Sequence, residues 1–181
     1  MKETLIKEDN YKRLFGSKIS QEVKWDRLEP FILEAQNTDL VEYLGGGLLI
    51  DLIENPSTEV NVKLLEGSVY EFTNGGKSYH EGVLKVLENL SYASYAYRGS
   101  FVDTPFSFVI KKSQDSIPVA SSDLKNLYNE HRNLAKKYWK RVEYFLNQNK
   151  ELYPLFIGST KNKENPITHK GVKTKLIRQD G

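Results

Sequence analysis

The sequence predicts a mainly helical fold, a small helical bundle built on one long C-terminal helix, with a β-hairpin insertion and an extended C-terminal arm. Three observations predict it. Apolar residues recur at helical spacing for about seven turns over residues 122–149. Asn74-Gly75 stands between alternating aromatic residues, which is typical of a hairpin turn. Residues 152–181 show no helical period. We therefore expect a helical domain over residues 1–156, a hairpin at about 69–80 and an arm over 157–181.

The first helices are expected to be short. Asp9 is positioned to cap a helical turn that Gly16 would end. A second helix is expected over residues 25–36, with Pro30 in its first turn, where a missing N–H costs little. Its apolar face would consist of Leu28, Phe31, Ile32 and Ala35.

A new helix start is predicted at Asn37-Thr38-Asp39, because Glu42 follows Asp39 at capping-box spacing. This helix should stop at Gly45-Gly46-Gly47. No Lys-Ser/Thr follows these glycines, so we interpret them as a tightly packed helix break rather than a phosphate loop. Two short helices are expected next, over residues 48–53 and 57–67, the second capped by Ser57 or Thr58.

The sequence of the second half of the chain predicts the hairpin and two long helices. Tyr70, Phe72 and Tyr79 flank the hairpin turn, and a pair of strands needs support from helices or from a neighbouring subunit. A helix is expected over residues 81–98, and an irregular segment with one strand, near Phe106–Ile110, over residues 99–120. The long helix over 122–149 would follow.

Composition excludes several classes of protein. The chain has 181 residues, 39% of them hydrophobic, and no cysteine, which excludes disulfides, a thiolate zinc site and a cysteine nucleophile. No apolar run approaches the roughly 20 residues that cross a bilayer, and the N-terminus has no apolar signal core. The net charge of +2 is too small to indicate a nucleic-acid or membrane partner. However, residues 161–181 hold six basic and two acidic residues.

No catalytic constellation is visible, so we expect a protein that is not an enzyme and has no cofactor or metal. His80, His131 and His169 are far apart in the sequence and have no metal-ligand spacing. The sequence has no nucleophile elbow, P-loop or dinucleotide fingerprint. His131 lies on the apolar stripe of the long helix, where it is expected to be a core or interface residue.

Two charged segments leave alternatives open. The cluster of Lys136, Lys137, Lys140 and Arg141 beside Trp139 is either a solvated or subunit-contacting helix face, which we favour, or a nucleic-acid site with phosphate contacts and stacking. The arm is either a solubilising tail or a segment that adds as a strand to a neighbour.

Four stretches resemble head–tail connector proteins of tailed phages, especially those of Bacteroidetes. They are TLIKEDNYKRLFG, LEPFILEAQNTDLVEYLGGGLLIDL, GGKSYHEGVLKVLENLSYASYAY and the segment from TPFSFVIKK to NKELYPLF. The second contains an Ala35-Gln36 pair before the Leu44-Gly45 break, and the last contains a Ser-x-Pro-Val cap before the long helix. The likeness covers residues 4–156, in the family's order and spacing.

This resemblance implies a mostly helical subunit of a ring, commonly of twelve copies, that docks below the portal and offers a platform to the next neck or tail protein. Phage DNA would pass through the ring without sequence-specific binding, and the protein would reside in the virion neck after synthesis in the host cytoplasm. The open alternatives are a tail-completion or stopper protein and a nucleic-acid-binding accessory protein. The residues expected to contact subunits, portal or tail are Tyr70, Phe72, Asn74, Gly75, Tyr79, Ile167, Lys170, Val172, Lys173, Lys175, Leu176, Ile177 and Arg178.

Overall fold

The computed structural model describes residues 3–72, 75–99, 101–103, 108–110 and 119–158. It confirms the predicted mainly helical class, with a small hairpin and one long helix. The elements are α1 (Tyr11–Phe15), the 3-10 turn η1 (Gly16–Lys18), α2 (Trp25–Ala35), the π-helical turn η2 (Gln36–Leu40), α3 (Val41–Leu44), α4 (Gly46–Glu54), α5 (Glu59–Glu66), β1 (Ser68–Glu71), β2 (Lys77–His80), α6 (Val83–Arg98), β3 (Phe101–Asp103), β4 (Phe108–Ile110) and α7 (Ser121–Gln148).

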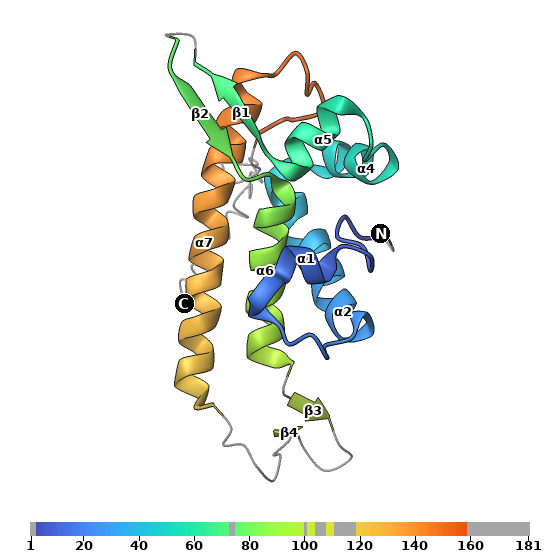
Figure 1. Cartoon of the computed structure of the whole chain (residues 1–181), viewed down its shortest axis with the longest axis vertical. Helices are drawn as coiled ribbons and strands as arrows, with labels where there is room; N and C mark the ends of the chain where they lie inside the picture. The colour runs from blue at the N-terminus through green and yellow to red at the C-terminus, as the bar shows by residue number, and fades with distance from the viewer. Residues whose placement is uncertain (1–2, 73–74, 100, 104–107, 111–118, 159–181) are drawn as a thin grey trace, which may run out of the picture.

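Helix α6 forms the middle layer of the molecule. Helix α7 packs along one side of it, and α1, α2 and α5 contact it from the other side (Figure 1). Its first three turns are buried on nearly every side, including the polar residues Glu88, Asn89 and Ser91. A helix enclosed in this way needs partners for its polar groups, since an unpaired buried polar atom is costly.

Helix α7 confirms the predicted long helix within one residue at each end. Its buried stripe includes His131, Ala135, Val142 and Phe145, as the helical period indicates. Trp139 also belongs to this stripe, where it stacks on Tyr43 with ring centroids 4.9 Å apart. None of the helices in the described residues is long and apolar enough to span a membrane.

Three expectations for the N-terminal half are wrong. The N-cap residue of α1 is Asn10, not Asp9, and its side chain makes no cap hydrogen bond. Pro30 is the sixth residue of α2, not part of its first turn, because the helix already begins at Trp25. The chain does not restart at Asn37-Thr38-Asp39 either. It continues through η2 into α3, and the Asp39 carboxylate binds the Arg132 guanidinium in two hydrogen bonds of 2.6 Å instead of capping a helix.

The π-helical turn η2 gives the buried Gln36 a structural role. Its side-chain oxygen accepts a hydrogen bond from the Leu5 N–H at 2.7 Å, and its amide nitrogen donates to the Glu3 carbonyl at 2.8 Å. Gln36 therefore pairs the backbone of the N-terminal segment as a strand would, and attaches that segment to α2.

The expected break at the three glycines is confirmed at Gly45, which has a φ of 80° and separates α3 from α4. The chain after α7 returns to this place. A Cβ on Gly45 would lie 3.4 Å from the Ile157 side chain, and one on Gly47 would lie 3.9 Å from Leu155. The Tyr153 hydroxyl donates to the Val60 carbonyl at 2.8 Å, and burial raises the pKa of Tyr153 to about 12. Residues 153–157 thus contact the helical body.

The predicted hairpin is confirmed. Strands β1 and β2 pair antiparallel, with Val69 opposite Tyr79 and Glu71 opposite Lys77. Beyond them the Phe72 N–H donates to the Gly76 carbonyl, and the Gly75 N–H donates to the Phe72 carbonyl. Gly75, which precedes β2, has a positive φ of 83°. A second pair, β3 and β4, lies where we expected a single strand.

Candidate interaction surfaces

The hairpin has an inner face that is part of the core. The Tyr70 ring lies 5.4 Å from the ring of Phe145, and the His80 ring lies 4.3 Å from it, centroid to centroid. Phe72 contacts Tyr144 of the same helix at 5.4 Å. The support that two strands require therefore comes from α7.

The outer face of the hairpin is uncovered in the described structure. Val69 and Tyr79 are direct cross-strand partners, and they remain 70% and 55% exposed. The Arg141 guanidinium lies 5.4 Å from the centre of the Tyr79 ring, and Arg141 also forms an ion pair with Glu81. Arg141 thus joins this apolar pair to α7.

The outward side of α7 adds further exposed side chains. Lys136, Lys137 and Lys140 are exposed there, and Tyr144, whose ring packs on Phe72, is 43% exposed. We define the hairpin–α7 face by its members, which are Val69, Tyr79, Lys136, Lys137, Lys140, Arg141 and Tyr144. It combines apolar and aromatic side chains with a rim of positive charge, a composition that is typical of protein interfaces.

The nucleic-acid alternative loses one of its sequence arguments. Trp139 is only 5% exposed and stacks on Tyr43, so it offers no surface to a base. Arg132 is also not available for phosphate contacts, because it forms an ion pair with Asp39. What remains for phosphate contacts is the lysine cluster itself with Arg141.

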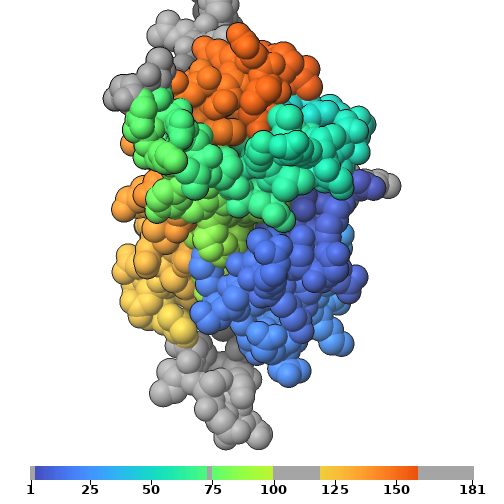
Figure 2. Space-filling view, turned by 45° about the horizontal axis from the view of Figure 1, so that its top comes forward, coloured from blue at the N-terminus to red at the C-terminus, as the bar shows by residue number. Residues whose placement is uncertain are grey.

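A second apolar patch lies at the end of the body from which the arm departs. Its exposed members are Ile50, Leu152, Leu155 and Ile157. Figure 2 shows the segment after α7, in orange, lying against α4 and α5, in teal, with the green hairpin beside it. The sequence pattern gave no signal for this patch, because residues 149–158 carry no period.

The expected contact residues are divided by the structure. Tyr70 and Phe72 pack within the subunit, Gly75 forms the turn, and Tyr79 faces outward. Asn74 lies outside the described residues, as do the expected contact residues of the arm, which are Ile167, Lys170, Val172, Lys173, Lys175, Leu176, Ile177 and Arg178. Val69 was missed because a single valine in a strand carries no orientation until the register is known.

The base of the hairpin holds a buried histidine in a defined tautomer. The Gly82 N–H donates to His80 Nδ1 at 3.2 Å, so Nδ1 carries no proton, and Nε2 then donates to the Ser68 hydroxyl at 3.0 Å. Burial lowers the pKa of His80 from 6.5 to about 4. The neutral ring is the form that fits the fold.

This histidine should make the protein sensitive to acid. Because the folded pKa is below the unfolded one, the stabilisation is complete above pH 6.5 and is lost as the pH falls toward 4. By pH 4 the loss from His80 alone should be about 3 kcal/mol. Urea denaturation at pH 7 and pH 4 measures it, with His80→Gln as the control that removes this contribution. An equal loss in both proteins would contradict the assignment.

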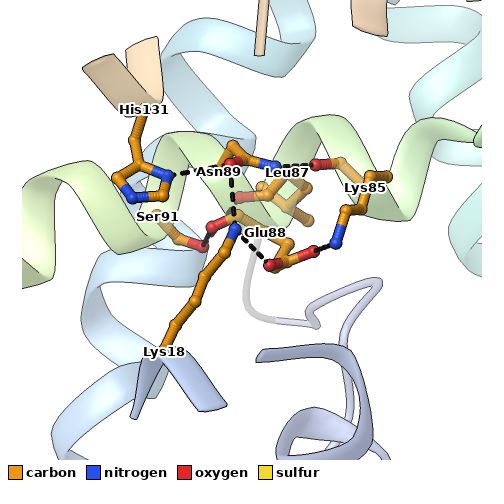
Figure 3. A network of polar contacts seen from close by, with 7 residues as sticks. All are labelled: Lys18, Lys85, Leu87, Glu88, Asn89, Ser91 and His131. Atoms are coloured by element: carbon orange, nitrogen blue, oxygen red, sulfur yellow. Dashed lines mark hydrogen bonds and ion pairs between the residues drawn. The ribbon is translucent and has the colours of Figure 1, made fainter. Parts of the chain in front are cut away.

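The largest buried polar cluster ties together η1, α6 and α7 (Figure 3). The Glu88 carboxylate is fully buried between the Lys18 ammonium at 2.6 Å and the Lys85 ammonium at 2.7 Å. Asn89 accepts hydrogen bonds from Lys18 at 3.0 Å and from His131 Nδ1 at 2.9 Å. Burial and the Lys18 charge lower the pKa of His131. The His131 side chain therefore has the core role expected for it.

Glu88 and Lys85 of this cluster also line a groove of about 310 Å³, together with Arg13, Glu66 and Glu81. No group of three or more His, Asp or Glu side chains within the described ranges is arranged to hold a metal ion. A shallow groove of about 520 Å³ between α6 and α7 is lined by Glu34, Asp39, Arg98 and Arg132, but these four form two ion pairs with each other.

Comparison with known proteins places the chain in a family. Residues 40–166 match a family of unknown function, DUF6712. The chain belongs to the DUF6712 family. No curated protein and no solved structure matches it. The DUF6712 match begins at Leu40 and includes both hairpins, α6 and α7, so the hairpin–α7 face lies within the region that defines the family.

Proposed function

We propose that this chain is a structural virion protein, a subunit of the head–tail connector ring that docks below the portal of a tailed phage. The observation that carries the proposal is the hairpin–α7 face. Its exposed Val69–Tyr79 pair stands on two elements that are themselves anchored in the core. Exposed apolar side chains on a rigid support are typical of a surface made to contact another protein.

The resemblance of residues 4–156 to connector proteins supplies the identity of the partners. They are further copies of the chain, the portal, and the next neck or tail protein. The ring would extend the DNA channel in the neck of the virion, and DNA would slide through it without sequence-specific contacts. In a head-to-tail ring each subunit offers two different faces to its neighbours.

The proposal is tested by the mass and symmetry of the full chain. Light scattering and negative-stain imaging are carried out over a concentration series, alone and mixed with portal rings of the phage that encodes the chain. We expect closed rings to form from the chain alone or, where it does not assemble alone, on the portal. A chain that stays monomeric at every concentration and does not bind the portal would overturn the proposal. Sixfold rather than twelvefold symmetry would favour the stopper alternative, which the resemblance also leaves open.

The two hairpin faces should respond differently to mutation. Tyr79→Ser on the outer face should change the free energy of unfolding by less than about 1 kcal/mol and reduce ring formation. Tyr70→Ser on the inner face should lower stability by about 3 kcal/mol, because it removes an aromatic ring packed on Phe145. Denaturation curves and ring counts separate the two effects. Normal ring formation by the Tyr79 variant would remove the outer face from the contact surface.

A further inference from the structure

Charge is divided between the two sides of the molecule. Residues 3–66, which include α1 to α5, carry thirteen acidic and seven basic side chains, whereas α7 carries six basic and three acidic ones. Helix α7 lies on one side of α6, and α2, α4 and α5 lie on the other (Figure 1). The net charge of +2 conceals this separation.

The charged side chains point outward on both sides. Lys136, Lys137 and Lys140 are exposed on the side of α7 that faces away from α6. Asp26 is exposed on α2, Glu29 is half-buried beside Leu28 of the same helix, and Glu54 is exposed at the end of α4. The ion pairs of α7 with the described residues use Arg132 and Arg141 instead, so the three lysines are available to a partner.

From this arrangement we infer that the basic hairpin–α7 face of one subunit docks on the acidic α2–α4 face of the next copy. This inference rests on the proposed ring and names its subunit interface. Two different, complementary faces on opposite sides of one chain are what a head-to-tail contact requires, because each copy can then use both. If two equivalent faces paired instead, like charges would meet, which opposes that arrangement.

A second copy fits these faces better than a nucleic acid does. The tryptophan next to the lysines is buried, so it offers no stacking surface to a base. The basic face also includes the exposed apolar pair of Val69 and Tyr79 beside Arg141. Exposed apolar side chains next to charged ones favour a folded protein partner.

Charge reversal tests the inference. The basic-face variant carries Lys136→Glu, Lys137→Glu and Lys140→Glu, and the acidic-face variant carries Asp26→Lys, Glu29→Lys and Glu54→Lys. Each alone brings like charges together at every contact, so assembly should weaken at least tenfold. In an equimolar mixture the two variants can alternate around the ring, and assembly should return to within about threefold of the wild type. Sedimentation at low salt, and ring counts on the portal, give the readout.

The controls separate this interface from net charge and from the proposed function. Lys7→Glu, Lys12→Glu and Lys150→Glu together change the net charge as much as the basic-face variant does, but these exposed residues lie outside both docking faces, so assembly should be unchanged. Rings that form normally from both reversed variants would overturn the interface and leave the connector proposal standing. A wild type that never assembles, with or without the portal, would overturn both. Loss of DNA-column retention in the basic-face variant, with normal assembly, would overturn the interface in favour of nucleic-acid binding.

Discussion

Gly82→Ala is expected to lower the free energy of unfolding by more than about 3 kcal/mol, because it combines backbone strain with a backbone clash. Gly82 has a φ of 83°, and a Cβ there would lie 2.2 Å from the Leu65 carbonyl oxygen and 2.5 Å from the Gly67 nitrogen. Gly67 is equally restricted, since its own Cβ would lie 2.4 Å from the His80 carbonyl oxygen. The two ends of the hairpin thus cross backbone to backbone, where no side chain can move aside.

Gly75→Ala is the matched control. Gly75 has the same φ of 83°, but a Cβ there would meet nothing within 4 Å. This substitution should cost only the left-handed backbone energy, about 1–2 kcal/mol. Urea denaturation of the two variants gives the difference, which measures the close approach at the hairpin base. Equal losses of unfolding free energy in both variants would show that the backbone segments at Gly67 and Gly82 lie farther apart than in the structure.

This crossing illustrates what the sequence could and could not predict. Asn74-Gly75 between aromatic residues was enough for the hairpin, because a turn signal and alternation are local. Gly67 and Gly82 carried no such signal. Their restriction comes from a contact between segments 15 residues apart, and only the packed structure brings those segments together.

The helices show the same difference between features with a local sequence signal and features set by distant contacts. The position of α7 was predictable because one face of it alone is buried, so the period is visible in the sequence. The central position of α6 was not, since a helix enclosed on every side includes buried polar residues such as Glu88 and Asn89 that look like surface in a sequence. The wrong helix start at Asn37-Thr38-Asp39 has a related cause. Asp39 resembles a capping residue locally, but the distant Arg132 takes its carboxylate.

The contact surface was predictable only in part. The aromatic residues of the hairpin were visible, but which of them faces outward depends on the register and on the side that α7 covers. Tyr70 and Tyr79 look alike in the sequence, and the fold assigns one to the core and the other to the surface. The charge separation was hidden for the same reason, because it depends on α6 lying between the acidic and basic helices.

The second large effect is expected when Glu88 loses both of its cations. The double variant Lys18→Met, Lys85→Met keeps the aliphatic stems but leaves a carboxylate with no solvent exposure and no opposite charge. Breaking a buried ion pair in this way typically costs about 3–5 kcal/mol, because the remaining charge is neither hydrated nor paired. Urea denaturation at pH 7 should show a loss of that size.

Adding Glu88→Met to the double variant isolates the cause. If the buried charge is responsible, the triple variant should recover to within about 1 kcal/mol of the wild type, since an apolar set of similar volume can replace a buried ion cluster at little cost. A triple variant as unstable as the double one would place the loss elsewhere, in the hydrogen bond from Lys18 to Asn89 or its contact with the Tyr92 ring. Recovery would mean that the cluster fixes the register of α6 against η1 and α7 more than it stabilises them. That role would hold α2 and α7, on which we propose the two docking faces, at a constant separation across α6.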